Sequence, residues 1–205
     1  MNKHRNSQKR YYDTNEVYFV TVKTQDNHPY FKEKIFSELL IEEIKLCKKL
    51  KKFNLFAFCI MYDHVHFLLQ PGGKYNISKV MQFLKRHFTR NVNYIMEYNN
   101  ELNSDPEGDI GQCRLPKEEQ EMLKNFIVKV KNYRNQFIQK HGVNQTSIPK
   151  FKWQKSYYDH IIRNERDMEY HYDYTANNFQ KHKLSNDWQY TSLKYNDILD
   201  IFLLI

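Results

Sequence analysis

The amino-acid sequence predicts an α+β fold in which helices pack on a ferredoxin-like, split β-α-β antiparallel sheet. The first observation is the order of apolar periodicities, which runs strand, helix, strand, strand, helix and, after an interruption, strand and helix. The second is a compact strand pair at residues 54–70, in the middle of this order. Such an order is typical of a split β-α-β sheet. We expect a single domain over residues 1–205, with an insertion at about 97–149.

The first half of the chain predicts a strand, a helix, a strand pair and a second helix. Glu16–Lys23 alternates and is rich in Val, Tyr and Phe, which is typical of a strand. Apolar residues take helical spacing from Phe31 to Lys52. Asn54–Gln70 holds two short apolar runs joined by polar residues, which predicts two paired strands. Helical spacing returns over Ile77–Ile95 and predicts a long second helix.

Residues 97–149 interrupt this pattern. Tyr98–Gly111 is polar and contains two glycines, so we expect a loop. Pro116 then opens a helix with acidic residues in its first turns, and Gly142 is placed to be its C-cap. The segment therefore predicts a helical insertion in a smaller fold.

A last strand and a last helix follow the insertion. Lys150–Ile162 has strand character, and Asn164 is a good N-cap for a helix over Glu165–Asn178. The apolar end of the chain, Ile198–Ile205, is shorter than the roughly 20 residues that a membrane helix needs. We expect this end to pack on the body of the protein or on another subunit.

The composition favours a nucleic-acid partner. The formal net charge is +8, and the chain contains 16 Tyr and 14 Phe. Basic charge suits a polyanion, and aromatic rings suit single-stranded nucleic acid because bases stack on them. The alternative is a Lys- and Asn-rich composition inherited from a biased genome. No membrane segment or secretory signal is expected, and three widely separated cysteines predict a reducing, cytoplasmic location.

Two histidines stand out in the central strand pair. Successive side chains of a strand point to opposite faces, so His64 and His66 share one face while Val65 and Phe67 share the other. Two imidazoles on one rigid face predict a site for a divalent metal ion. The alternative is that both rings only pack against neighbours.

The last predicted helix offers a second group of reactive side chains. Tyr174, Asn178 and Lys181 lie at i, i+4 and i+7, which places a phenol, a carboxamide and an ammonium on one helix face. Tyrosine is a known covalent nucleophile, although its phenol needs help to attack at neutral pH. Spacing alone does not choose Tyr174 over Tyr170 and Tyr172.

Three motifs resemble those of the REP-associated branch of the single-tyrosine, or HUH, transposases. They are MYDHVHFLLQP at 61–71, WQKSYYDHIIR at 153–163, and HYDY at 171–174 followed by TANNFQKH at 175–182. The resemblance covers roughly residues 11–96 and 150–190. One departure is Phe179, which stands where the family usually has proline and lets a helix run on.

The resemblance implies a transposase that cuts and joins single-stranded or hairpin DNA. His64, His66 and Asn178 would hold Mg²⁺ or Mn²⁺ on the scissile phosphate. Tyr174 would attack it to give a 5′-phosphotyrosine and a free 3′-OH, with Lys181 as a catalytic partner and without ATP. The active form would be a monomer or a homodimer.

Basic side chains are the candidate DNA contacts. Lys85, Arg86 and Arg90 lie on the polar face of the helix over Ile77–Ile95, and Arg163 ends the second motif. A solvated basic helix face explains the first three equally well.

Three other functions compete with transposition. The first is a domesticated DNA-binding protein that no longer cuts. The second is a metal-dependent nuclease that uses water, with His64, His66 and either Asp159 or His160 as ligands. The third is an RNA-binding module on the same type of sheet, but the strands lack its aromatic signature.

Overall fold

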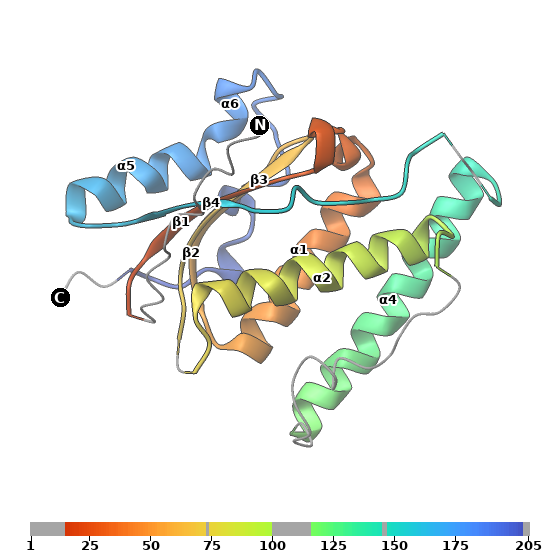
Figure 1. The fold of residues 1–205 in the computed structure, drawn as a ribbon, viewed down its shortest axis with the longest axis horizontal. Coiled ribbons are helices and arrows are strands. Elements are labelled where there is room, and N and C mark those ends of the chain that lie inside the picture. Colours follow the sequence, from red (N-terminus) through yellow and green to blue (C-terminus); the bar gives the residue numbers. More distant parts are fainter. Residues whose placement is uncertain (1–14, 73, 100–115, 145–146, 203–205) are drawn as a thin grey trace, which may run out of the picture.

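The computed structural model describes residues 15–72, 74–99, 116–144 and 147–202 (Figure 1). The predicted loop at Tyr98–Gly111 lies almost wholly outside these described residues. The last residues of the apolar C-terminal segment, 203–205, lie outside them as well.

An antiparallel sheet forms the centre of the described structure. Its strands are β1 (Tyr18–Lys23), β2 (Asn54–Ile60), β3 (His64–Gln70) and β4 (Tyr158–Ile161), in the spatial order β2-β3-β1-β4. β3 pairs antiparallel with both β1 and β2, and β1 also pairs antiparallel with β4. Because β1 separates β3 from β4 and each half contains a helical crossover, this is the ferredoxin-like split sheet that the sequence predicts.

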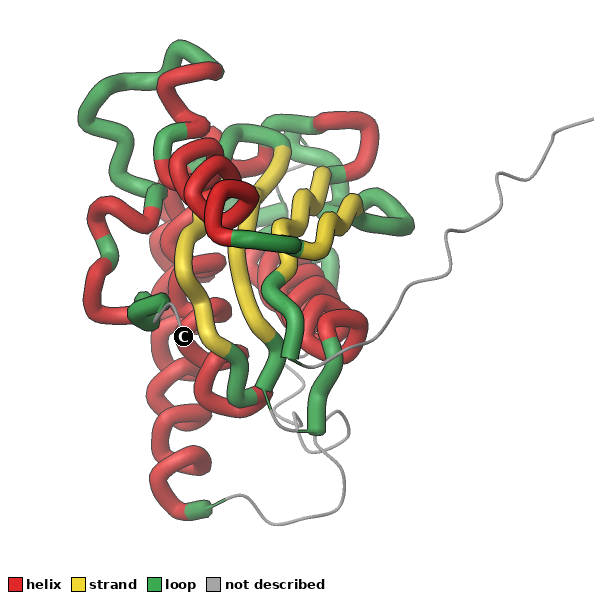
Figure 2. Tube along the Cα trace, turned by 90° about the vertical axis from the view of Figure 1, so that its left-hand side faces the viewer, coloured by secondary structure: helices red, strands yellow, loops and turns green. Residues whose placement is uncertain are grey.

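Helices cover both faces of the sheet. α1 (Lys34–Lys51) and α2 (Ile77–Ile95) pack together on one face, and α4 (Lys117–His141) packs on both of them as an outer layer. α5 (Glu165–Ala176) and α6 (Asn178–Lys181) lie on the opposite face. Figure 1 shows the sheet between these two groups of helices, and Figure 2 shows its strands side by side.

The alternation of strand side chains separates two apolar cores. Val20 and Phe67 point into the large core beneath α1 and α2. Phe19 and Leu68 point the other way, into a smaller core that includes Met168 of α5. A strand thus assigns each side chain to one helical layer, and this places every second residue of β3 on the α5 side.

The helix of the predicted insertion shares the large core. Leu123, Phe126, Val130 and Phe137 of α4 are buried in the same cluster as the residues of α1 and α2. Gly142 is the C-cap, as predicted, with a φ of 83° that favours glycine. Burial of these apolar side chains explains how a helix from outside the split sheet is held in place.

Glu33 anchors the far end of α4 to the start of α1. Its carboxylate accepts hydrogen bonds from Lys140 Nζ at 2.9 Å and from His141 Nε2 at 2.8 Å. Burial alone would raise the pKa of the Glu33 carboxyl, but these two partners outweigh burial and hold the pKa below its usual value.

We expect Glu33→Gln to lower the free energy of unfolding by about 1 kcal/mol at pH 7, because Lys140 is exposed and screened. A lowered carboxyl pKa contributes stability above the usual pKa of Glu and loses it as the pH falls through the lowered value. Urea unfolding at several pH values checks this. The two proteins should become more alike in acid, and a difference independent of pH would contradict the assignment.

The last strand is shorter than predicted. Strand structure was expected over Lys150–Ile162, but β4 covers only Tyr158–Ile161, with an isolated bridge between Trp153 and Thr24. The reason is that residues 150–157 turn toward α2, where the Trp153 Nε1–H donates to the Lys85 carbonyl oxygen at 3.2 Å. We call residues 150–157 the strap.

The described part of the C-terminal segment packs on the body of the protein. Ile198 is buried in the large core. The Asp200 side chain accepts a hydrogen bond from the Leu55 N–H at 2.7 Å, and the Phe202 ring packs edge-on against Phe56. Of the two predicted alternatives, packing on the body of the protein is therefore the one observed for the described part of this segment.

Candidate functional site

His64 and His66 lie side by side on the face of β3 that α5 and α6 cover. Their ring centroids are 4.9 Å apart, and both residues are buried, at 6% and 4% exposure. His64 Nδ1 lies 2.6 Å from Asp63 Oδ1, and His66 Nδ1 lies 2.8 Å from Thr21 Oγ1 of β1. A bond at Nδ1 fixes the orientation of each ring and leaves Nε2 for a ligand.

Asn178 brings an unpartnered carboxamide to this pair. Among the described residues, neither Oδ1 nor Nδ2 of Asn178 has a hydrogen-bond partner, and neither does His66 Nε2, although all three atoms are buried. Asn178 is close enough to His66 to act against the lowering of its pKa by burial, but no bond of good geometry joins them. Each such atom costs about 1–3 kcal/mol, so their gathering at one point indicates a place built for a ligand.

These donors fit a divalent metal ion. Imidazole nitrogen and carboxamide oxygen are both ordinary ligands of such ions. Burial lowers the pKa of both histidines, and the pKa of His66 falls to about 3. The neighbouring imidazoles of His64 and His182 lower the pKa of His66 further. The rings are therefore neutral near pH 7, which is the form that binds a metal.

Tyr174 of α5 reaches the same place. Its ring centroid lies 5.4 Å from that of His66 and 5.7 Å from that of Phe19. Lys181 Nζ lies 4.8 Å from the centre of the Tyr174 ring. The structure therefore gathers all five predicted residues of the reaction centre, from β3, α5 and α6, on one face of the sheet.

The prediction of one continuous helix through Asn178 is wrong. α5 ends at Ala176, Asn177 has φ −105° and ψ 11°, and the short α6 begins at Asn178. Thr191 Oγ1 donates to the Ala176 carbonyl oxygen at 2.6 Å and so satisfies the end of α5. Phe179 is buried in a small cluster with Cys59 and Met61 on the sheet.

Phe179, in place of proline, was expected to let the helix run on, but the helix breaks just before it. Proline is not needed for the bend, because burial of the Phe179 ring draws α6 onto the sheet. Asn178 then meets His66 through the bend, rather than through one shared helix face.

Sequence analysis did not assign a role to His182. Its ring centroid lies 5.0 Å from that of His64, and the residue is exposed. The available signal was its position one helical turn after Asn178. A single histidine in a polar stretch is a weak signal, which is why it was missed.

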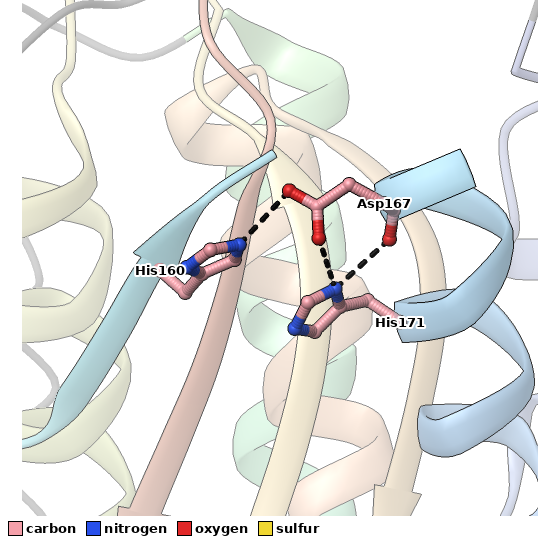
Figure 3. A group of neighbouring side chains, drawn as sticks. All are labelled: His160, Asp167 and His171. Atoms are coloured by element: carbon pink, nitrogen blue, oxygen red, sulfur yellow. Dashed lines mark hydrogen bonds and ion pairs between the residues drawn. The ribbon is translucent and has the colours of Figure 1, made fainter. Parts of the chain in front are cut away.

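A second cluster joins β4 to the start of α5 (Figure 3). Asp167 Oδ2 lies 2.9 Å from His160 Nε2, and Asp167 Oδ1 lies 3.0 Å from His171 Nδ1. Residues of these types could hold a metal ion. Each of the three, however, is already hydrogen-bonded within the cluster, so the cluster serves as a clamp in the described structure. Since His160 lies here, it does not join His64 and His66 as a third ligand.

The clamp supports the tyrosine helix. His171 lies one turn before Tyr174, and its ring centroid is 4.8 Å from that of Phe19. Phe19 in turn contacts both Tyr174 and His66. Packing thus runs continuously from the clamp to His66 and Tyr174.

The predicted DNA contacts do not form one patch. Lys85, Arg86 and Arg90 line a groove between α2 and the strap. Arg163 lies in the turn between β4 and α5, where its N–H donates to Asp167 Oδ2 at 3.1 Å. The first three are therefore separated from the fourth.

Comparisons with known proteins bear on this arrangement of a strand-borne histidine pair, a nearby tyrosine and a split antiparallel sheet. The sequence model of the family described as "Transposase IS200 like" matches residues 12–105, which include His64 and His66 but not Tyr174. The resemblance to REP-associated tyrosine transposases that the three motifs indicate is confirmed by these comparisons.

Two particular proteins show this likeness. The chain is 27% identical over 180 residues to a "Putative REP-associated tyrosine transposase" of Haemophilus influenzae, which covers 86% of this chain and 78% of that protein. The solved structure of a REP-associated tyrosine transposase bound to a REP hairpin matches with a TM-score of 0.50 at 16% identity, over 96% of this chain and 86% of the other. This second match supports the fold.

Within the described residues, no helix combines the length and apolar character needed to cross a membrane.

Proposed function

We propose that this protein is a transposase that acts as a metal-dependent endonuclease and strand transferase on single-stranded DNA beside a REP-like hairpin. The observation that carries the proposal is the meeting of Tyr174 with His64, His66 and Asn178, where buried ligand atoms lack partners among the described residues. The likeness to REP-associated tyrosine transposases supports DNA as the substrate and hence a cytoplasmic site of action. We also propose that residues 1–205 form a single domain with an insertion at about 97–149, which the shared core of α1, α2 and α4 supports.

The proposed reaction exchanges one phosphodiester bond for another. The Tyr174 oxygen forms a bond to phosphorus, the bond from phosphorus to the 3′ oxygen breaks, and the 3′ oxygen leaves and takes up a proton. The downstream strand stays on the protein as a 5′-phosphotyrosine, and attack by another 3′-OH reverses the step. The bond energy is conserved, so no ATP is needed.

Other residues would bind the metal ion, orient its ligands and stabilise charge. His64, His66 and Asn178 would hold Mg²⁺ or Mn²⁺, which supplies polarisation of the phosphate oxygen when bound. Asp63 and Thr21 orient the two imidazoles. Lys181, beside the Tyr174 ring, stabilises negative charge on the phenol oxygen as its proton leaves. We propose a monomer or a homodimer as the active form.

The test is a search for the covalent intermediate. The protein is incubated with Mn²⁺ and a hairpin oligonucleotide that carries a single-stranded flank and a label at either end, and the products are separated under denaturing conditions. We expect the downstream fragment to stay attached to the protein and the upstream fragment to end in a 3′-OH that a polymerase extends. Chelation of the metal should prevent both products.

The competing functions give other products. A nuclease that uses water releases both fragments free of protein. A binding protein that no longer cuts shifts the DNA under native conditions and leaves it intact under denaturing conditions. Either result contradicts the proposal.

A further inference from the structure

His182 lies beside the proposed metal ligands and has no part in the function proposed above. The His182 N–H donates to the Asn178 carbonyl oxygen at 3.3 Å, so the two residues lie one helical turn apart on α6. Burial of the Phe179 ring holds α6 on the sheet. Lys183, with a φ of 55°, ends the helix directly after His182 in a left-handed turn. The main chain of His182 is therefore fixed relative to Asn178.

The His182 ring approaches the histidine pair of β3. Its centroid lies 5.0 Å from that of His64, and the centroids of His64 and His66 lie 4.9 Å apart. Burial is the main reason why the pKa values of His64 and His66 are lowered, and the charge of His182 lowers both further. An electrostatic effect on both rings indicates that His182 lies near both of them.

These separations suit three imidazoles that share one metal ion. A ring nitrogen bound at about 2.1 Å puts the centre of its ring about 3.2 Å from the ion. Two such rings at an angle of about 90–110° around the ion have centroids about 4.5–5.2 Å apart. The observed separations of 4.9 and 5.0 Å both lie in this range. His182 is thus placed where a ligand of the same ion would be.

Packing and hydrogen bonding explain the position of the His182 ring poorly. The residue is exposed, and the one ring that it contacts among the described residues is that of His64. No described residue forms a hydrogen bond with either of its ring nitrogens. Every other histidine in the described part of the chain, except His28, has a ring nitrogen bonded to protein. Both ring nitrogens of His182 are therefore open to a ligand.

A third imidazole changes which ion the site prefers. Mg²⁺ takes oxygen ligands and gives up its water reluctantly. First-row transition ions accept imidazole, with an affinity that rises from Mn²⁺ toward Cu²⁺. Each added imidazole therefore favours even Mn²⁺, the weakest binder of that series, over Mg²⁺.

We propose that His182 is a further ligand of the ion that His64, His66 and Asn178 would hold, and that the three imidazoles make this site prefer a transition-metal ion such as Mn²⁺ to Mg²⁺. This ligand set rests on the proposed function, which supplies the metal site. It goes beyond that function in the number of ligands and in the choice of ion.

The test counts the imidazoles on Mn²⁺ in protein without DNA. Pulsed electron paramagnetic resonance detects the nitrogen atoms bound to Mn²⁺, and calorimetry with competition measures the dissociation constants of Mn²⁺ and Mg²⁺. His182→Ala removes the proposed ligand from an exposed position, so the fold should survive. His28→Ala is the matched control, because the His28 ring also lacks a hydrogen bond to the described residues and packs on Tyr30 at 4.3 Å.

We expect three imidazole nitrogens on Mn²⁺ in wild type and in His28→Ala, and two in His182→Ala. Affinity for Mn²⁺ should fall about tenfold or more in His182→Ala, because one bond to the ion is lost. Affinity for Mg²⁺ should change by less than about threefold, because Mg²⁺ gains little from imidazole. His28→Ala should match wild type with both ions.

Two nitrogen ligands in wild type, or three in His182→Ala, overturn the assignment of His182 and leave the site of His64, His66 and Asn178 standing. An equal loss of affinity for Mn²⁺ and Mg²⁺ in His182→Ala also overturns it, since a general electrostatic effect would then explain the loss. Failure of the proposed function has a different signature. Wild-type protein would then bind Mn²⁺ through three imidazoles and form no adduct with a hairpin that carries a flank. Wild-type protein that binds no Mn²⁺ contradicts both proposals.

Discussion

Tyr174→Phe is expected to reduce the denaturation-resistant protein–DNA adduct to the detection limit while leaving DNA binding unchanged. The substitution removes the only atom of this side chain that can bond to phosphorus. It keeps the ring that packs against Phe19 and His66, so the free energy of unfolding should change by less than about 1 kcal/mol. A denaturing gel measures the adduct, and native anisotropy measures binding.

The neighbouring tyrosines are the matched controls. Tyr170 stacks on Tyr174 at 6.2 Å but is 64% exposed. Tyr172, at 37% exposure, lies instead beside Phe56 and Phe202. Tyr170→Phe and Tyr172→Phe should both keep the adduct. A nucleotide mapped to Tyr170 by mass spectrometry, or an adduct formed by Tyr174→Phe, would falsify the choice of Tyr174.

The sequence was sufficient to predict the fold and the shared face of the two histidines. Both follow from local periodicity, because alternation along β3 determines which side chains face α5. The same alternation places Val65 and Phe67 in the opposite core, as predicted.

What sequence reasoning missed depends on contacts between distant segments. Helical spacing continues through Asn177, and only the burial of Phe179 against β2 and the bond from Thr191 end the helix there. Thr21 lies 45 residues before its partner His66, and nothing in its local pattern predicts that bond. The strap likewise leaves the sheet because of a contact with a distant segment, since Trp153 bonds to α2.

Burial of the histidines also changes how their substitution should be interpreted. His66 is 4% exposed and stacks on Phe19 at 5.4 Å. His66→Ala therefore removes packing as well as a ligand, and we expect it to destabilise the protein by about 1–3 kcal/mol. Loss of cleavage in this variant alone would not separate the two effects.

The variant Asn178→Leu separates the loss of a metal ligand from the loss of packing. Leucine has the same number and branching of side-chain heavy atoms as asparagine, and it removes two buried polar atoms that lack partners among the described residues. We expect the free energy of unfolding measured with urea in EDTA to stay level or rise by about 1 kcal/mol. Cleavage should nevertheless fall at least about a hundredfold, since one ligand of the ion is removed.

Thermal unfolding with and without Mn²⁺ supplies the second readout. Wild-type protein should gain stability with Mn²⁺ concentration as RT ln(1 + [Mn²⁺]/Kd), because the ion binds the folded state. Asn178→Leu and His66→Ala should both lose most of this gain, although their stabilities in EDTA change in opposite directions. Asp167→Asn serves as the control, since it alters the clamp beside α5 and spares the three proposed ligands. If Asp167→Asn lost the response to Mn²⁺ and Asn178→Leu kept it, the metal would belong to His160, Asp167 and His171 instead.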